Sequence, residues 1–186
     1  MSPFLLVDEI VAAQTPQLEA PFIDILGDVR QIIEIGFSRG GFSLWLHRHK
    51  RSDCRLICYD ITKKFLQVPP ECNIDFRIGD CFSLDTATEI IRFIRRPRKT
   101  LLLCDGGNKE KEFNLFCEFM KPGDIIMLHD YADNNDDYER IKARLNRPSP
   151  AESFYENIRE RVQARGLNKY DYDRMKEVLW GAFAAT

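Results

Sequence analysis

Residues 31–43 read QIIEIGFSRGGFS, a short apolar run followed directly by a turn rich in glycine. The run has the length of a strand, and the residues from Phe42 onward have the period of a helix. Gly36 allows a tight turn, while Gly40 and Gly41 allow a ligand or a neighbouring backbone to come close. The free N–H groups at the start of the helix favour a carboxylate or another anion in the turn. The stretch predicts the first strand, turn and helix of an α/β sheet.

The alternation of strand and helix recurs along the chain. Further strands are expected over residues 55–59, 74–78, 99–104 and 124–128, and a last one over 177–185, where a helix is the alternative. Helices are expected over residues 86–95, 110–120 and 153–165, and the first of them opens with Thr86-x-x-Glu89, the pattern of a capping box. Most of the strands are almost continuously apolar, as in sheets covered on both faces. The pattern predicts a doubly wound, mostly parallel sheet with helices on both faces.

The composition narrows the class of protein. The chain has 186 residues and a formal net charge of −2, which weighs against nucleic acid as the partner. No apolar run reaches the roughly 18 residues that a membrane span needs. The N-terminus has no basic leader, and six cysteines without a C-x-x-C pair indicate reduced thiols. We therefore expect a cytoplasmic protein.

The length predicts one domain with three segments. Residues 1–30 are expected to form an N-terminal extension of one or two short helices. Residues 31–131 would form the ligand-binding core, and residues 132–186 an acidic loop, a helix and a final strand. The acidic loop starts near Asp130, with Tyr131 and Tyr138 available to contact a substrate.

Polar side chains follow the predicted strands where ligands bind in open α/β sheets, at the carboxyl ends. Asp60 ends the second strand and could accept hydrogen bonds from both hydroxyls of a ribose. Asp80 and Cys81 follow the third strand and could meet the edge of an adenine. The glycine pattern is G-x-x-x-G-G, with Ser38 in place of the second glycine of the dinucleotide fingerprint. This difference counts against NAD or FAD.

The segments EIGFSRGGFSLWLHR, CYDIT, RIGDCFS and LLLCDGGNKEKEFNLFCEFMKPGDIIMLHDYA occur in this order between Glu34 and Ala132 and cover roughly residues 29–131. Their succession resembles the motifs of class I S-adenosylmethionine-dependent methyltransferases. The most similar branch is that of small-molecule and sugar O-methyltransferases, which includes macrocin-type and cephalosporin-hydroxylase-like proteins. The resemblance implies a Rossmann-like sheet of seven strands. Because six strand candidates can be identified, the sheet is expected to be shortened at its C-terminal edge.

The resemblance also implies roles for individual residues. The turn around the methionine moiety and the start of its helix would bring together Glu34, Gly36, Phe37, Ser38, Gly40, Gly41 and Ser43. Asp60 would hold the ribose, with Ile61 against the adenine, and Asp80 and Cys81 would meet the adenine edge. Asp105 would face the amino end of the cofactor and the reaction centre.

Metal-dependent relatives carry ligands at positions that match Asp105, His129 and Asp130 here. Two carboxylates and an imidazole suit a transition ion such as manganese better than an all-oxygen magnesium site. Without a metal, His129 could act as the general base. A hydrogen-bonded turn without catalytic function is a further interpretation of His129 and Asp130.

The sequence thus predicts an enzyme that methylates an oxygen of a small molecule or sugar, with Asp105, His129 and Asp130 at the catalytic centre. A methyltransferase-like binding module without activity is one alternative, and an NAD-type oxidoreductase of related fold is another. The basic residues from Arg92 to Lys99 are expected to form a solvated face, with an acidic substrate or a nucleic-acid phosphate as the alternative. The stretch LWGAF (residues 179–183) could seat a homodimer.

Overall fold

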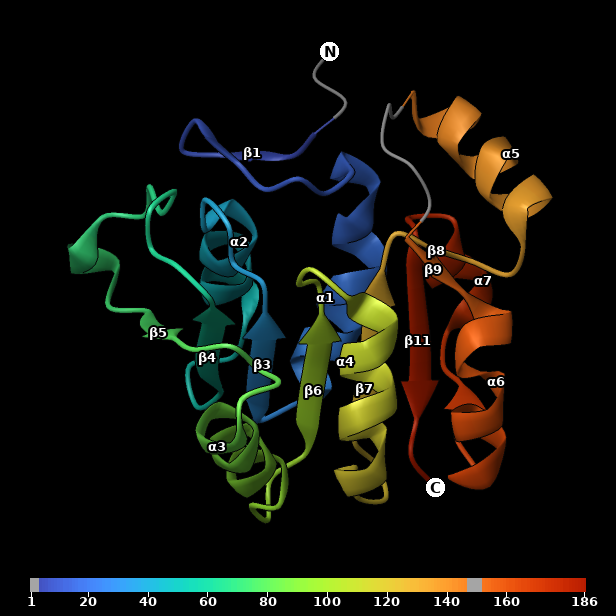
Figure 1. Ribbon diagram of the computed structural model, residues 1–186. Coiled ribbons are helices and arrows are strands. Elements are labelled where there is room, and N and C mark those ends of the chain that lie inside the picture. The colour runs from blue at the N-terminus through green and yellow to red at the C-terminus, as the bar shows by residue number, and fades with distance from the viewer. Residues whose placement is uncertain (1–3, 147–151) are drawn as a thin grey trace.

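A central sheet dominates this computed structural model, which describes residues 4–146 and 152–186 (Figure 1). Within those ranges the sheet has seven strands in the order β10-β11-β7-β6-β3-β4-β5. The strands are β3 (Gln31–Ile35), β4 (Arg55–Asp60), β5 (Asp75–Ile78), β6 (Thr100–Cys104), β7 (Ile125–His129), β10 (Asn168–Lys169) and β11 (Trp180–Ala184). β3 to β7 are parallel, whereas β11 is antiparallel to β7 and β10 is antiparallel to β11.

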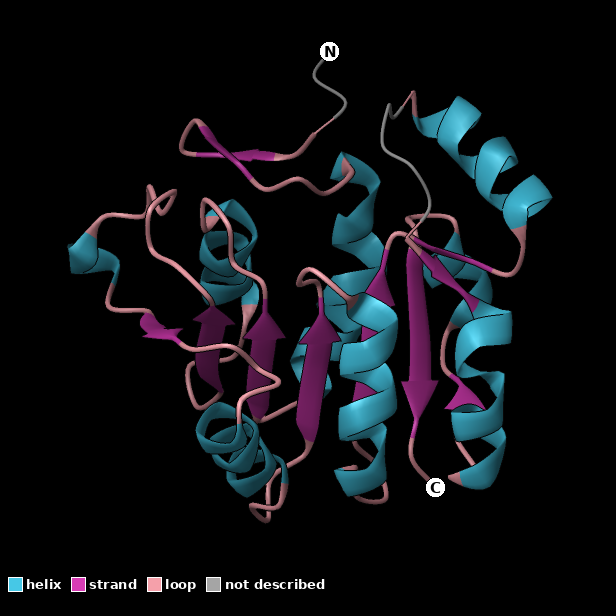
Figure 2. Ribbon diagram, in the orientation of Figure 1, coloured by secondary structure: helices cyan, strands magenta, loops and turns pink. Residues whose placement is uncertain are grey.

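The central strands are almost continuously apolar because both faces are covered. Every residue of β3, β6 and β7 is buried. One face packs against α1 (Glu19–Asp28), α2 (Gly41–His49) and α7 (Tyr172–Lys176). The other packs against α3 (Leu84–Ile94), α4 (Lys109–Phe116) and α6 (Tyr155–Ala164), as Figure 2 shows in the same orientation. The short helices η1 (Pro16–Leu18), η2 (Pro70–Cys72) and η3 (Cys117–Phe119) complete the layers.

This architecture confirms the doubly wound, Rossmann-like fold. The expected strand over residues 177–185 is β11, so the strand interpretation of that segment is right and the helix is wrong. The sheet is not shortened, because β10 supplies a seventh strand at its edge. β10 escaped prediction because it has two residues, both exposed, and therefore lacks an apolar pattern.

The expectation of helices over residues 1–30 is wrong in part. β1 (Leu6–Val7) and β2 (Ile10–Val11) form a hairpin ahead of α1. The turn residues Asp8 and Glu9 have φ values of 49° and 68°, the left-handed pair of a two-residue hairpin turn. Neither residue is the glycine or asparagine that usually marks such a turn, so the sequence carried no hairpin signal.

The acidic loop expected from Asp130 to Glu139 is also wrong in part, because its second half belongs to helix α5 (Asn135–Leu145). The Asn134 side chain caps this helix by accepting a hydrogen bond from the Asp137 N–H group, 3.0 Å away. Before α5, β8 (Tyr131–Ala132) pairs with β9 (Ser153–Phe154). Tyr131 and Tyr138 are buried, with exposed fractions of 0% and 1%, and so do not line a surface open to substrate.

The helix expected over residues 86–95 begins two residues earlier, and its N-cap is Ser83 rather than Thr86. The Ser83 hydroxyl accepts a hydrogen bond from the Thr86 N–H group.

The stretch 179–183, considered as a dimer surface, is buried between β7 and β10. Its side chains therefore cannot form an interface in this arrangement.

The chain reverses its direction of winding between β3 and β6. From β3 it proceeds outward to β4 and β5, then crosses back to β6 on the other side of β3. At such a switch point the loops that leave the two strands diverge and open a crevice at their carboxyl ends. Gly36 borders it at a φ of +89°, and a Cβ atom there would lie 2.3 Å from the carbonyl oxygen of Asp105.

Asp124 ties the amino ends of β6 and β7 together from a buried position. Its carboxylate accepts hydrogen bonds from the N–H groups of Thr100 at 2.8 Å and Lys121 at 2.9 Å. The Lys121 ammonium donates to the same carboxylate at 2.6 Å. We expect Asp124→Ala to lower the free energy of unfolding by about 2–4 kcal/mol, because these buried donors lose their acceptor.

Urea unfolding followed by circular dichroism measures this loss. The matched control is Asp136→Ala, at an exposed position in α5, which should cost about 0.5 kcal/mol or less. Equal costs for the two substitutions would contradict the role of Asp124.

Candidate functional site

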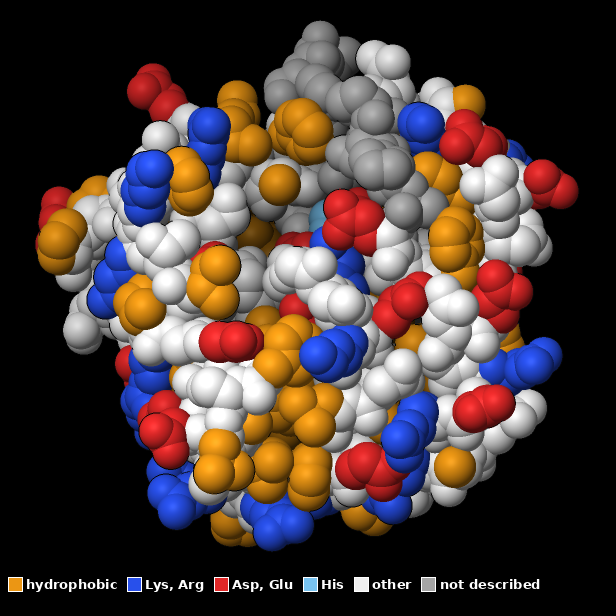
Figure 3. All heavy atoms as spheres, viewed as in Figure 1, with side chains coloured by type: hydrophobic (Ala, Val, Ile, Leu, Met, Phe, Trp, Pro, Cys, Tyr) orange, Lys and Arg blue, Asp and Glu red, His pale blue; other side chains and the backbone are white. Residues whose placement is uncertain are grey.

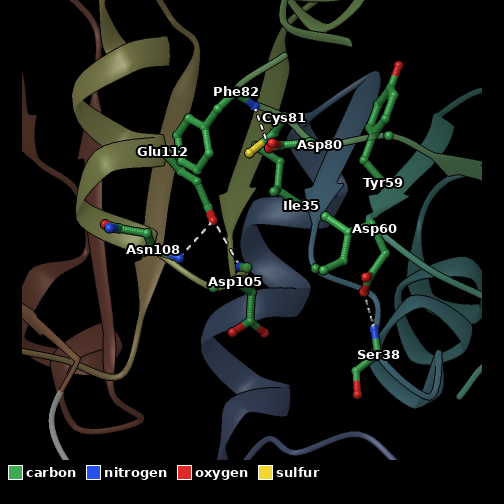
Figure 4. A pocket seen from close by; sticks show the side chains of 15 residues that line it. Ile35, Ser38, Tyr59, Asp60, Asp80, Cys81, Phe82, Asp105, Asn108 and Glu112 are labelled. Atoms are coloured by element: carbon green, nitrogen blue, oxygen red, sulfur yellow. Dashed lines mark hydrogen bonds between the residues drawn. The ribbon is translucent and has the colours of Figure 1, made fainter.

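The main crevice lies at the carboxyl ends of β3, β4 and β6 and has a volume of about 350 Å³ (Figure 4). The predicted site residues that line it are Gly36, Ser38, Asp60, Ile61, Asp80, Cys81 and Asp105. A second hollow, beside it and beneath the N-terminal hairpin, is lined by Glu34, Gly36, Phe37, Ser38, Gly41 and Asp105. The two spaces share Gly36, Ser38 and Asp105 and therefore adjoin at the switch point.

Two predicted cofactor residues line neither space. Gly40 faces the side chains of Leu66 and Val68, where a Cβ atom would lie 2.5 Å from Val68. Ser43 is fully buried and donates a hydrogen bond to Glu34 at 2.5 Å. Both residues support the turn from behind.

Asp60 stands at one end of the main crevice, where β4 ends. One carboxylate oxygen accepts a hydrogen bond from the Ser38 N–H group at 2.9 Å, and the other accepts one from the Thr62 N–H group at 3.3 Å. The bond from Ser38 ties the carboxylate to the glycine-rich turn, as Figure 4 shows. A carboxylate accepts up to about four hydrogen bonds, so acceptor capacity remains for ribose hydroxyls.

The loop after β5 forms another wall of the crevice. The carboxylate of Asp80 accepts a hydrogen bond from the Phe82 N–H group at 2.9 Å and so fixes the turn. The neighbouring Cys81 is 6% exposed, and burial raises the pKa of its thiol to about 12. Cys81 therefore offers the crevice an uncharged, polarizable surface at neutral pH.

Glu112 fixes the loop that carries Asp105, and sequence reasoning missed it. Its carboxylate accepts hydrogen bonds from the N–H groups of Gly106 at 3.2 Å and Asn108 at 3.3 Å. Burial raises the pKa of Glu112 to about 7. Glu112 lies in a polar helix, and nothing in the sequence around it indicates that its side chain points back at the crevice.

The residues Asp105, His129 and Asp130 form what we call the acid–histidine cluster. Their candidate ligand atoms all lie within 4.8 Å of one another. The His129 Nδ1 atom is 2.8 Å from Asp105 Oδ1 and 3.5 Å from Asp130 Oδ2. The side chains are 13%, 3% and 9% exposed, in the order Asp105, His129, Asp130. The structure thus brings together the three residues that the sequence predicts.

The backbone explains how two adjacent residues reach the same cluster. Successive side chains of a strand point to opposite faces of the sheet, which would separate His129 from Asp130. His129 is the last residue of β7, and Asp130 has a φ of 51°, in the left-handed region. The chain turns at Asp130, and the side chain returns to the same side as His129. Aspartate tolerates this conformation better than most residues do.

Gln14 and Trp180, from opposite ends of the chain, contact the acid–histidine cluster and fix its orientation. Trp180 pairs with His129 across β11 and β7, and their rings stack with centroids 4.8 Å apart. The indole N–H group donates to Gln14 Oε1 at 2.9 Å, and Gln14 Nε2 donates to Asp105 Oδ2 at 2.8 Å. Because an indole nitrogen can only donate, Trp180 fixes which end of the Gln14 amide faces Asp105.

Sequence reasoning missed Gln14 and gave Trp180 no role in the site. No local motif marks either residue, because their role follows from contacts between residues far apart in the sequence. Gln14 and Asp105 are 91 positions apart, and Gln14 and Trp180 are 166 positions apart.

Lys109 is a further residue that the sequence did not reveal. Its ammonium lies 3.5 Å from Asp130 Oδ2 and also bonds to Glu152, although the side chain is 6% exposed. Burial favours the neutral amine, but the carboxylates of Asp105, Asp130 and Glu152 outweigh it and raise the pKa of Lys109. Lys109 is therefore a charged ammonium at the edge of the acid–histidine cluster.

The mouth of these spaces is visible in Figure 3, where the face is hollowed at upper centre and acidic, basic and histidine side chains meet. The basic residues 92–99 do not line it. They join α3 to the start of β6, at the amino end of a parallel strand, opposite the crevice. Lys99 pairs there with Asp28, and Arg96 stacks on Phe93 at 4.3 Å. The basic residues 92–99 therefore do not contact a substrate at the switch point.

Comparison with known proteins defines the class. The FtsJ-like methyltransferase family model matches residues 18–142, and the chain belongs to this family. It is an S-adenosylmethionine-dependent methyltransferase, which confirms the predicted enzyme class and cofactor and displaces the oxidoreductase alternative. No curated protein matches the sequence significantly. Within the described ranges, no helix has the length and apolar character that crossing a membrane requires.

Solved structures share the fold at low sequence identity. A CmcI structure with Mg and SAM matches with a TM-score of 0.70 and 18% identity, over 98% of this chain and 76% of that chain. An O-methyltransferase from Bacillus cereus in complex with SAH gives a TM-score of 0.54 and 18% identity, over 90% and 79%. The MycE methyltransferase, in complex with Mg and SAH, gives 0.54 and 16%, over 92% and 49%.

Glu34 generates a prediction about pH and stability. Burial raises the pKa of its carboxyl from 4.5 to about 8, so the folded state binds a proton that the unfolded state releases above pH 4.5. The free energy of unfolding should therefore fall as the pH rises from about 4.5 to 8, by on the order of 3 kcal/mol from this group. Glu34→Gln should flatten that decline, because glutamine can keep the Ser43 hydrogen bond without titrating.

Urea unfolding at pH 5 and pH 8 measures the difference. Glu160→Gln, at an exposed position, is the control and should leave the pH dependence of the wild type unchanged. An equally steep decline in Glu34→Gln would contradict the assignment.

Proposed function

We propose that the chain transfers the methyl group of S-adenosylmethionine to an oxygen of a small molecule or sugar. The observation that carries this proposal is the position of Asp105. One face of its loop borders the main crevice, and its carboxylate joins the acid–histidine cluster. A cofactor seated in the crevice would therefore lie next to a group of side chains able to orient an acceptor hydroxyl.

In this proposal the main crevice binds the nucleoside. Asp60 accepts hydrogen bonds from the ribose, with Ile61, Asp80 and Cys81 around the adenine. The methionine moiety extends along Gly36 and Ser38 toward Asp105, into the space shared with the second hollow. Glu34 and Gly41 support that hollow from below. The structures of CmcI with SAM and of the Bacillus cereus enzyme with SAH have the same fold, which supports this placement.

We further propose that Asp105, His129 and Asp130 bind a divalent ion. The donor set fits such an ion, because ligands at about 2.0–2.2 Å from one metal lie about 3 Å apart when adjacent. The distances of 2.8 Å and 3.5 Å between His129 Nδ1 and the two carboxylates are close to that value. The CmcI and MycE structures with Mg provide further support.

The side chains have distinct tasks in this scheme. Asp105, held by Gln14, and Asp130, held by Lys109, supply negative charge at a nearly buried site. His129 is oriented by its stack on Trp180 and presents Nδ1 to both carboxylates. When a divalent ion is bound, an acceptor hydroxyl that contacts it is more acidic and is easier to align with the methyl group. His129 acting as general base without an ion is the second candidate for the same step.

The first test concerns the cofactor contact. We expect Asp60→Asn to weaken the binding of S-adenosylhomocysteine by about tenfold or more, because hydrogen bonds to a charged group contribute about 1.5–3 kcal/mol. Asparagine can keep one backbone contact of the turn, so the loop should stay folded. Isothermal titration calorimetry measures the affinity, with Asp136→Asn as the surface control. An unchanged affinity in a folded Asp60→Asn protein would refute the ribose contact.

The second test concerns the acid–histidine cluster. A panel of hydroxylated small molecules and sugars is offered with methyl-labelled S-adenosylmethionine, with and without a chelator. We expect transfer to stop on chelation and to return with manganese. His129→Ala should weaken manganese binding about tenfold or more, because losing a group that only orients a metal ligand already costs about 10–100-fold.

The outcomes separate the candidates. Transfer that survives chelation but is lost in His129→Ala would favour the general base. A chain that binds S-adenosylhomocysteine but transfers no methyl group to any acceptor would favour the binding module.

A further inference from the structure

The ammonium of Lys109 lies at the edge of the acid–histidine cluster, beside Asp130. Lys109 is the first residue of α4, and the side chain of Asn108 caps that helix by accepting from the Lys111 N–H group at 3.0 Å. From there Lys109 turns back and donates to the carbonyl of Gly106 at 3.3 Å. The charge is thereby anchored to the loop that carries Asp105, and is not free to extend into solvent.

Two carboxylates on different segments share this ammonium. Asp130 Oδ2 is 3.5 Å from Nζ on the inner side, within the acid–histidine cluster. Glu152, next to β9, contacts it on the outer side and is 44% exposed. The pairing of β8 with β9 brings Glu152 to this position. Lys109 is therefore already bonded to a second anionic partner, on the side away from the cluster.

The charges have a direct consequence for cation binding. Asp105 and Asp130 together supply two negative charges, of which the Lys109 ammonium offsets one. A divalent ion would approach the same Asp130 oxygen that faces the ammonium, and two cations at short range repel strongly where burial keeps water away. The Glu152 carboxylate, which is already bonded to the ammonium, offsets part of this repulsion.

We propose that Lys109 sets the affinity of the acid–histidine cluster for a divalent ion by competing with that ion for Asp130, with Glu152 holding the ammonium when the ion takes Asp130. The inference rests on the proposed metal site. Lys109 keeps Asp130 compensated until the ion binds, and makes ion binding weaker and more readily reversible than it would be with two uncompensated carboxylates. Lys109 acts on the ion through Asp130 in this account, and it needs no contact with the acceptor.

The experiment is a manganese titration of the full chain saturated with S-adenosylhomocysteine, followed by the electron paramagnetic resonance signal of free Mn²⁺. Lys109→Met removes the charge at nearly constant volume and should bind Mn²⁺ about tenfold tighter than the wild type or more, since it removes a cation a few ångströms from the site. Lys109→Arg keeps the charge and should stay close to the wild type. Glu152→Gln removes the second partner and should weaken Mn²⁺ binding.

The matched control is Lys111→Met, two residues further along α4, where the ammonium is exposed and lies 4.4 Å from the Phe82 ring centroid. It should change the affinity for Mn²⁺ by less than about twofold, because solvent screens an exposed charge. Thermal melting and S-adenosylhomocysteine affinity establish that each variant is folded. If Lys109→Met does not fold, Glu152→Gln carries the test, and unchanged or tighter Mn²⁺ binding there overturns the proposal.

The failures of the two proposals can be told apart. If the wild type binds Mn²⁺ and Lys109→Met binds it equally or more weakly, the competition is refuted and the metal site stands. If neither protein binds Mn²⁺ at millimolar concentration, the proposed metal site fails and the competition fails with it. Binding seen in Lys109→Met alone would support the competition in its strongest form.

Discussion

The close approach of β3 and β6 at their carboxyl ends is the constraint on which the rest of the site depends. The backbone of Asp105 occupies the space that a side chain at position 36 would need. Glycine fits there because it has no side chain. Because the two strands touch there and then diverge, the loops that follow them open a crevice on one side and place the Asp105 carboxylate on the other. A larger residue at position 36 would push the two loops apart and move the Asp105 carboxylate away from the crevice.

The acid–histidine cluster is held by residues from every part of the chain. Gln14 reaches it from the segment between β2 and η1, Lys109 from α4 and Trp180 from β11, the last strand along the chain. Each contributes one directed contact to a carboxylate, an imidazole or an amide. Buried polar groups are costly when they lose a partner, so a network of this kind keeps its members in one arrangement. The geometry of the cluster therefore depends on the whole sheet being assembled.

The sequence predicts those parts of the molecule that have a local pattern. The apolar runs of β3, β6 and β7 mark the sheet because they are buried on both faces. Asp60, Asp105 and His129 could be found because each lies at the end of such a run. The hairpin of β1 and β2 could not, since its turn lacks glycine and asparagine, and α5 is so polar that it resembles a loop.

Gln14, Lys109 and Trp180 were beyond sequence reasoning for a different reason. Their positions follow from tertiary contacts between segments far apart in the chain, which periodicity cannot register. The choice of cap at Ser83 rather than Thr86 shows the same limit on a smaller scale, because two hydroxyl residues in one turn compete for the same role.

A crystal structure of the chain with S-adenosylhomocysteine and Mn²⁺ tests the central claim most directly. The account predicts the ribose hydroxyls within hydrogen-bond distance of Asp60 and the sulfur beside Asp105. It also predicts an anomalous peak for manganese among Asp105, His129 and Asp130. A nucleoside bound away from the switch point, or a peak remote from these three side chains, would contradict it.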